Sequence, residues 1–167
     1  GWPVVAANVP RPLASAVGRR GLAALDTLTA NERGYAAASI ECPDDAYRAR
    51  FLDQMRGHSA PGTAPSDTMP TAMAERFYLA QCVKDETMAE SVVSALTRAG
   101  SGVTVLHVTG AFHSDYGQGT VSRIRRRTPD ARVITVSAVP VADPAVAAPG
   151  DVDATRADYI VFTRRPR

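Results

Sequence analysis

The segment from Thr109 to Gly119 carries the residues most suited to chemistry in this chain. It reads Thr-Gly-Ala-Phe-His-Ser-Asp-Tyr-Gly-Gln-Gly, so His113 and Tyr116 stand three residues apart among glycines. An imidazole nitrogen and a phenol oxygen can each bind iron or exchange a proton. Glycine adopts backbone conformations that other residues resist and lets a ligand approach closely. We therefore predict a binding turn whose backbone is shaped by three glycines: Gly110, Gly117 and Gly119.

This turn directly follows a short apolar run, Val103 to Val108, which predicts a buried strand. The turn therefore lies at the carboxyl end of that strand. In open α/β sheets, ligands bind at this edge. The position strengthens the prediction that His113 and Tyr116 contact a ligand.

A second candidate feature lies on a long predicted helix, about Thr71 to Ala99. Six of its residues recur at helical spacing and share one face, four of them apolar and two polar: Phe77, Gln81, Asp85, Met88, Val92 and Leu96. Burying an unpaired carboxylate is costly, so Asp85 needs a partner or a cavity. Gln81 and Asp85 either line a pocket and orient a ligand-holding residue, or cap backbone groups of a neighbouring loop.

The remaining elements alternate between strands and helices. Val4 to Val9 predicts a strand that carries Asn8 to its end, and Pro10 and Pro12 then open a helix. Further patterns predict helices over 43–57 and 120–127, a loop over 58–70, and strands over 132–139 and 158–163.

This order predicts an α/β fold with a mainly parallel sheet flanked by helices. The length of 167 residues suits one domain with its own core, so we expect residues 1–167 to form a single domain. Because the chain opens inside a predicted strand, we expect the N-terminal part of the fold to be missing from it.

Charge and composition exclude several classes of partner. With 19 basic and 17 acidic residues the net charge is +2, so no global field attracts nucleic acid or a membrane. The basic run Arg123 to Arg127 lacks interleaved aromatic residues and predicts a solvated helix face. No apolar stretch is long enough to span a bilayer.

The two cysteines give no metal-binding pattern. Cys42 and Cys82 form no CxxC motif and no Cys/His spacing typical of zinc. We predict two buried free thiols and no metal site.

Taken together, three segments resemble the ChaN family. Ala74 to Ala89 resembles its AQ…D…MA helix, and Gly110 to Pro129 resembles its glycine–histidine turn and following helix. Pro3 to Arg11 resembles its strand ending in Asn-x-Pro-Arg. The three segments occur in the family's order and cover most of the chain. The family is similar to the Tiki/TraB/erythromycin-esterase superfamily.

The resemblance implies a bacterial haem-binding protein for haem or iron uptake, without catalytic residues. It implies a periplasmic or outer-membrane lipoprotein, held to the membrane only by an upstream lipid anchor, and a homodimer that can place haem at its contact. Haem would be held by His113 or Tyr116, with arginines pairing its propionates. The supporting residues would be Asn8, Gln81, Asp85 and the three glycines of the turn.

The resemblance also implies an upstream strand with a Gly-Glu-x-His-like motif, and this chain lacks that strand. It therefore leaves two alternatives open. One is a hydrolase, an esterase or metal-dependent protease, in which His113 is base or metal ligand, Asp85 orients it, and the upstream Glu/His pair completes the site. The other is an interaction domain that has lost its ligand. We expect binding rather than catalysis.

Overall fold

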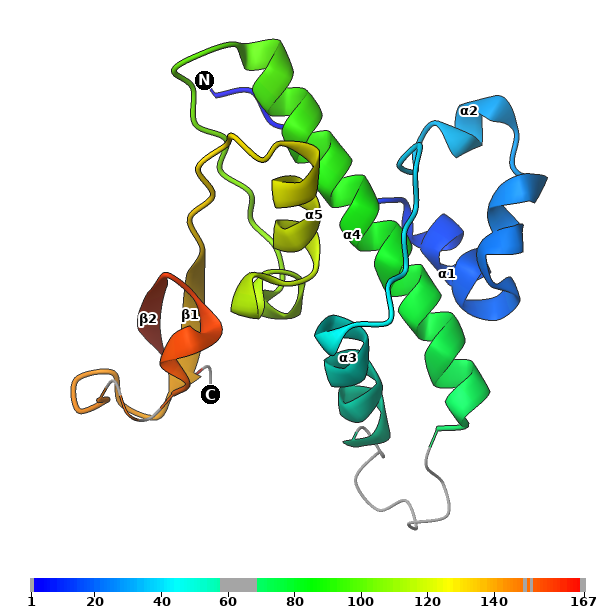
Figure 1. Cartoon of the computed structure of the whole chain (residues 1–167). Helices are drawn as coiled ribbons and strands as arrows, with labels where there is room; N and C mark the ends of the chain where they lie inside the picture. The colour runs from blue at the N-terminus through cyan, green and yellow to red at the C-terminus, as the bar shows by residue number, and fades with distance from the viewer. Residues whose placement is uncertain (1, 58–68, 149, 151, 166–167) are drawn as a thin grey trace.

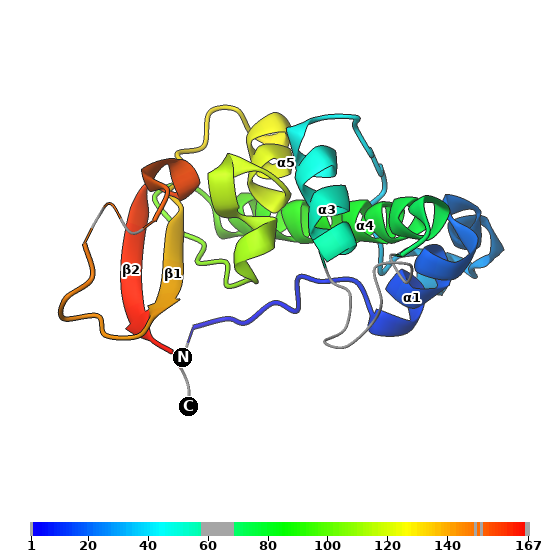
Figure 2. The ribbon, with the colours of Figure 1, turned by 90° about the horizontal axis from the view of Figure 1, so that it is seen from below.

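The computed structural model describes residues 2–57, 69–148, 150 and 152–165. One long helix, α4 (Thr71–Ala99), runs through the middle of the molecule and contacts α1 (Arg11–Arg20), α3 (Ala46–Gly57) and α5 (Thr120–Arg127) (Figure 1). A small sheet lies at one end of the molecule and α1 at the other (Figure 2). The helices therefore form the body of the described fold. Most of the expected loop over 58–70 lies outside the described residues.

Local signals in the sequence set the ends of these helices. α1 follows Pro10, carries a second proline in its first turn and ends at Gly21, whose φ is 74°. α4 follows Pro70 and ends at Gly100, whose φ is 86°. Proline is pre-set for a helix start and glycine tolerates the positive φ after a helix end. A shorter helix, α2 (Ala30–Arg33), is held by a capping box between Thr29 and Glu32.

The centre of α4 is buried on all sides. α1 covers one side of it with the apolar cluster around Val17 and Val83. α3 covers another with the cluster around Tyr47, Phe51 and Tyr78. Polar residues at the helix centre must therefore find partners inside the protein. The predicted apolar face is wrong at Phe77, whose side chain remains 36% exposed although its ring lies beside Gly18 of α1.

The sheet contains two parallel strands, β1 (Val136–Val141) and β2 (Tyr159–Arg164), with Val136 paired to Tyr159. Helices beside parallel strands confirm the α/β class. β1 begins four residues later than the predicted 132–139, and residues 132–135 before it belong to no strand.

Two predicted strands form no sheet in the described part of the chain. Residues 4–9 and 103–108 both lie outside any strand. A strand requires a neighbour for its backbone hydrogen bonds, and no described strand pairs with either segment. Val4, Leu106 and Val108 stay largely exposed as a result. The prediction of strands was therefore wrong at these two places.

The structure bears on two further predictions, that both cysteines are buried free thiols and that no segment spans a bilayer. Cys42 and Cys82 are both free, but only Cys82 is buried; Cys42 is half-buried. The pKa of Cys42 is lowered, first by a hydrogen bond from Cys82, so the two thiols are neighbours. Among the described helices, none combines the length and the apolar character needed to cross a membrane.

Candidate functional site

The glycine-rich turn folds back on itself, so that the backbone of His113 lies against that of Gly119 at the end of the turn. It folds as two short 3-10 helices, η3 (Ala111–His113) and η4 (Asp115–Gly117). Gly119 has a φ of 56°, and a Cβ there would lie 2.6 Å from the carbonyl oxygen of His113. Only glycine permits this approach of two backbone segments. Gly119 therefore fixes where the His113 backbone stands.

Asp85, in the buried centre of α4, receives three hydrogen bonds from three different elements. Its Oδ1 lies 2.8 Å from Nδ1 of His113 and accepts from Thr120 Oγ1 at 2.8 Å. Its Oδ2 accepts from the Tyr47 hydroxyl at 2.6 Å. The side chain is fully buried. These donors compensate the loss of water around the carboxylate.

Gln81 lies one turn earlier on α4 and belongs to the same cluster. Its Nε2 donates to the Tyr47 hydroxyl at 2.9 Å. Burial, followed by the charge of Asp85, raises the pKa of Tyr47. The phenol therefore keeps its proton, accepts from Gln81 and donates to Asp85. The sequence left two roles open for Gln81 and Asp85, to orient a ligand-holding residue or to cap backbone groups of a loop. Their hydrogen bonds go to side chains, those of Tyr47 and His113, so the geometry corresponds to the first role.

The cluster fixes the tautomer of His113. Nδ1 lies 2.8 Å from Asp85 Oδ1 and 3.1 Å from Gln81 Nε2. A carboxylate only accepts, so we assign the shorter contact as a hydrogen bond from a proton on Nδ1. In a neutral imidazole, Nε2 then carries the lone pair. No described residue forms a hydrogen bond with Nε2, and the side chain is partly exposed. Nε2 can therefore bind a metal or accept a proton.

Tyr116 belongs to the same turn but has different neighbours. Its φ of 63° is positive, an uncommon conformation for a non-glycine residue. Its ring lies 4.9 Å from the guanidinium of Arg50. The pKa of Asp153 is lowered by hydrogen bonds from Thr155 and, to a smaller degree, from Tyr116. The phenol of Tyr116 is thus engaged with Asp153, and within the described residues it has no hydrogen bond to the Asp85 cluster.

The other predicted supporting residues have simpler surroundings. Asn8 is exposed, and no hydrogen bond in the described chain joins it to Asp85 or His113. Gly110 precedes η3, and a Cβ there would meet the His113 ring at an ordinary 3.8 Å. Gly117 has a φ of 65° and adjoins the guanidinium of Arg125. Of the three glycines, Gly119 is therefore the one whose lack of a side chain the His113 backbone requires.

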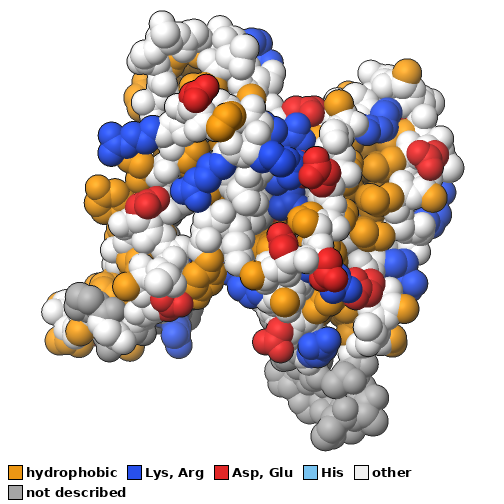
Figure 3. Space-filling model, in the orientation of Figure 1, with side chains coloured by type: hydrophobic (Ala, Val, Ile, Leu, Met, Phe, Trp, Pro, Cys, Tyr) orange, Lys and Arg blue, Asp and Glu red, His pale blue; other side chains and the backbone are white. Residues whose placement is uncertain are grey.

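The basic run from Arg123 to Arg127, predicted to be a solvated helix face, instead forms ion pairs with a buried carboxylate. Three of its arginines contact the fully buried Glu86 of α4: Arg123, Arg126 and Arg127. Arg123 is itself almost fully buried and also donates to the carbonyl of Gly119 at 2.9 Å. Figure 3 shows Lys and Arg side chains beside Asp and Glu side chains near α5. These arginines therefore fasten α5, and the turn before it, onto α4.

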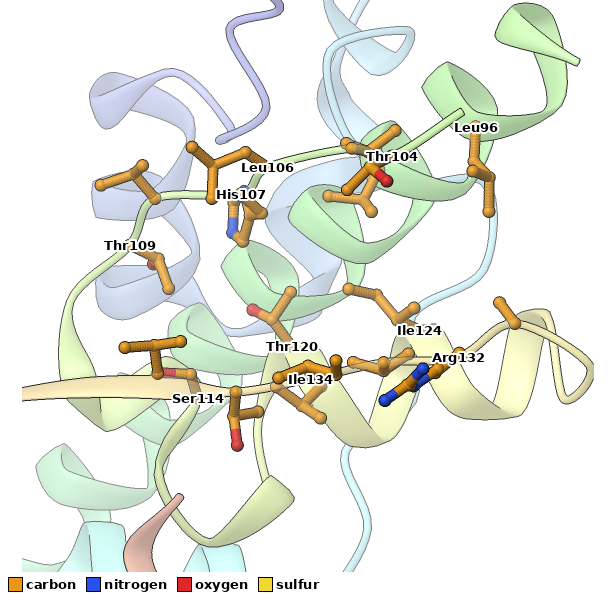
Figure 4. Close-up of a pocket in the computed structure, with 18 of the residues that line it drawn as sticks. Leu96, Thr104, Leu106, His107, Thr109, Ser114, Thr120, Ile124, Arg132 and Ile134 are labelled. Carbon is orange, nitrogen blue, oxygen red and sulfur yellow. The ribbon is translucent and has the colours of Figure 1, made fainter. Parts of the chain in front are cut away.

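A cavity of about 940 Å³ lies beside this cluster, between residues 103–109 and 131–138. Its polar lining includes Thr109, Ser114 and Thr120, and Arg132 lies farther along it (Figure 4). His107 also lines it, and its Nε2 is shielded from solvent without a hydrogen-bond partner in the described chain. The pKa of His107 is lowered by burial and then by His113, while Asp85 opposes the shift. His107 is therefore a neighbour of the cluster.

Sequence reasoning missed four residues that contact or adjoin His113 and Asp85: Tyr47, Arg50, His107 and Thr120. Tyr47 lies within the helix predicted over 43–57, where its ring fits an apolar position, and His107 lies within the strand predicted from Val103 to Val108. The spacing His107-x5-His113 and the threonine directly after Gly119 were visible signals. Among the described residues, no group of three or more His, Cys, Asp or Glu side chains is arranged to hold a metal ion.

The comparisons with known proteins match this arrangement to a family. A family described as "Haem-binding uptake, Tiki superfamily, ChaN" matches residues 1–124, which include α4, the glycine-rich turn and the start of α5. No curated protein and no solved structure matched the chain. The matched residues are well over half of the 167 and hold the whole Asp85 cluster. The chain therefore belongs to the ChaN family of the Tiki superfamily, whose members are described as haem-binding uptake proteins.

Proposed function

We propose that this chain binds haem and that His113 supplies a nitrogen ligand to the iron. The observation that carries the proposal is the 2.8 Å contact between Asp85 Oδ1 and His113 Nδ1, which leaves Nε2 as the free nitrogen. Histidine ligands of metals commonly donate their other ring nitrogen to a carboxylate, which fixes the ring and increases its basicity. Haem iron accepts an imidazole of this kind.

The surroundings of His113 fit a large, planar, partly anionic ligand. Phe112, the residue before His113, packs its ring near those of Tyr47 and Phe51, and the Arg50 guanidinium lies 4.3 Å from the centre of the Phe112 ring. Arg50 donates to the Phe112 carbonyl at 3.0 Å, and its Nε is buried without a partner in the described chain. A guanidinium pairs well with a carboxylate, so we assign Arg50 to a haem propionate.

We prefer His113 to Tyr116 as the iron ligand for a geometric reason. Tyr116 already stacks against Arg50 and interacts with Asp153, whereas Nε2 of His113 has no competing partner among the described residues. Ligation by Tyr116 requires its phenol to leave Asp153 and lose its proton. His113 needs neither step.

The test is a titration with hemin, followed through the Soret absorbance. We expect saturable binding by the wild-type chain, loss of the band in His113→Ala, and partial recovery of the band when imidazole is added to that variant. Ser114→Ala is the matched control, because among the described residues its hydroxyl bonds only to the nearby Ala111 carbonyl. Tyr116→Phe should keep the band. No saturable band in the wild type, or an unchanged band in His113→Ala, contradicts the proposal.

The family description also supports a role in haem or iron uptake. We propose that the protein acts in the bacterial periplasm or at the outer membrane, through an upstream lipid anchor, and that a homodimer is the haem-binding form. Cell fractionation with antibody detection tests the location. Sedimentation of the protein with and without hemin tests the dimer. A cytoplasmic location or a haem-loaded monomer contradicts the corresponding part.

A hydrolase is the second candidate, because the same contact suits a general base. Asp85 holds His113 in the tautomer whose Nε2 can take a proton from water. In the described residues, however, no serine, threonine or cysteine hydrogen-bonds to Nε2 as a nucleophile. Metal analysis and an ester- and peptide-hydrolysis screen distinguish the two functions. Bound divalent metal and turnover without a Soret band favour the hydrolase.

A further inference from the structure

Cys42 and Cys82 come from distant parts of the chain and meet in the fold. Cys82 belongs to the buried cluster that α3 and α4 form together, and Cys42 packs against that cluster. A hydrogen bond from Cys82 lowers the pKa of the Cys42 thiol. A disulfide can form only where two cysteine side chains approach each other in this way.

The backbone directly after Cys42 is fixed to α4. The carbonyl of Pro43 accepts a hydrogen bond from the Tyr78 hydroxyl at 2.7 Å. Tyr78 lies one helical turn before Cys82, so this bond holds the segment that leads into α3 against α4 (Figure 1). Residues 40–45 belong to no helix or strand, so no helix or sheet hydrogen bonds oppose the small movement that a sulfur–sulfur bond requires.

The backbone directly before Cys42 is fixed from the other direction. The carbonyl of Glu41 accepts from the Arg123 guanidinium at 3.2 Å, and Arg123 pairs with the buried Glu86 of α4. Glu86 lies one helical turn after Cys82. Cys42 therefore stands between two anchored neighbours whose partners lie on either side of Cys82 along α4.

The two thiols differ in access and in acidity. Cys42 is half-buried, whereas Cys82 is fully buried. The pKa of Cys82 is raised, first by its hydrogen bond to Cys42 and then by burial. Because the thiolate is the attacking form of a cysteine, Cys42 is the thiol that meets a reagent from solution and reacts first. Cys82 lies beside it and reacts second.

We propose that Cys42 and Cys82 form a reversible disulfide by exchange with a small disulfide of the glutathione class. The Cys42 thiolate attacks one sulfur of that disulfide, its S–S bond breaks, and the first glutathione leaves with the electron pair and takes up the Cys42 proton. The Cys82 sulfur then attacks the Cys42 sulfur, and the second glutathione leaves as a thiolate that takes up the Cys82 proton. Two protein thiols are oxidised, and one glutathione disulfide is reduced to two thiols.

The disulfide would join the segment before α3 to the centre of α4. Tyr47, in the first turn of α3, donates to Asp85, which lies three residues after Cys82. The bridge therefore fastens α3 where it reaches the Asp85 cluster. Since a disulfide restricts the unfolded chain more than the folded one, the oxidised protein should unfold at a higher urea concentration than the reduced protein. The inference is independent of haem binding.

The experiment incubates the reduced full chain with glutathione buffers of increasing oxidised share. After acid quenching and denaturation, maleimide labelling and mass spectrometry count the free thiols. We expect both thiols of the wild type to disappear together, with loss of two hydrogens, a peptide that links residues 42 and 82, and full recovery in dithiothreitol. In concentrated urea the same titration should need an at least about tenfold larger oxidised share, because the fold holds the two thiols at a high effective concentration.

Two serine variants test the order of attack. Cys82→Ser should stop at the mixed disulfide, with one glutathione on Cys42, whereas Cys42→Ser should keep the buried Cys82 thiol free. Circular dichroism checks that each variant folds, and the linked peptide of the wild type requires neither variant. The inference is overturned if the wild type keeps both thiols, stops at a glutathione adduct or joins two chains. It is also overturned if the urea and native titrations coincide, or if Cys42→Ser takes up glutathione as readily as Cys82→Ser.

Discussion

Asp85 and His113 lie 28 residues apart in the chain, yet Oδ1 of one lies 2.8 Å from Nδ1 of the other. The contact joins the buried centre of α4 to a glycine-rich turn that is mostly half-buried. The Asp85 carboxylate, which has no access to solvent, thereby decides which ring nitrogen of His113 carries the proton and which one is free. Its effect on haem binding can be measured by changing the acceptor alone.

Asp85→Asn should weaken hemin binding by about 10- to 100-fold, as is usual when the partner of a metal-ligating histidine is removed. An asparagine keeps the size of the side chain, but its amide can present a donor to Nδ1 and favour the other tautomer. A Soret titration measures the effect. Glu90→Gln, directly after the last buried residue of the same helix, is the control. Equal affinities of Asp85→Asn and the wild type mean that the contact does not orient His113.

Gly119→Ala should displace the backbone of His113, an effect beyond the cost of placing alanine at the positive φ of Gly119. A Cβ at Gly119 would lie 2.6 Å from the His113 carbonyl oxygen, so the turn must open. Gly102→Ala is the matched control, because its φ of 76° carries a similar conformational cost and nothing lies within 4 Å of its Cβ. Gly102→Ala should lose about 1 kcal/mol of unfolding free energy, and Gly119→Ala should lose more because of the added clash. Only Gly119→Ala should also lose hemin affinity, and equal hemin affinity in the two variants contradicts the role of Gly119.

The helices of this fold and the strand over 158–163 could be predicted closely, whereas the strands over 4–9 and 103–108 could not. The bounds of α4 and α5 follow from residues at their own ends, such as Pro70 and Gly100. Strands depend on neighbours, so the apolar run over 103–108 gave the wrong expectation of a strand. The pattern of residues along the chain does not show whether a partner strand lies next to the segment in the fold.

The candidate site was predictable to a similar degree. Gln81, Asp85 and His113 stood out because polar groups interrupted an apolar face or a glycine-rich turn, and the structure brings these three together. Tyr47 did not stand out, because its ring fits an apolar stripe and only the fold shows that its hydroxyl reaches Asp85. The basic run was misread because the buried Glu86 that pairs with it lies on another helix.

Glu86→Ala should destabilise the protein strongly while Glu41→Ala should not. Removing Glu86 leaves the buried Arg123 without its carboxylate, and breaking a buried pair in this way costs about 3–5 kcal/mol. Glu41 pairs with Arg126 at 3.3 Å but is 57% exposed, so its loss should change stability by about 1 kcal/mol or less. Urea unfolding followed by circular dichroism gives both values. Similar midpoints for the two variants would falsify the structural role of Glu86.

Acid should destabilise the apoprotein partly through His107. Its pKa in the fold is lowered from 6.5 by burial, so the unfolded chain takes up a proton at a higher pH than the folded chain does. The stability that the neutral His107 allows is therefore fully present above about pH 6.5, and it is lost as pH falls from there through the folded pKa. His113 enhances this effect and Asp85 opposes it. Urea midpoints measured from pH 8 down to pH 5 should fall less steeply in His107→Gln than in the wild type, whereas parallel curves show that His107 takes up its proton equally in both states.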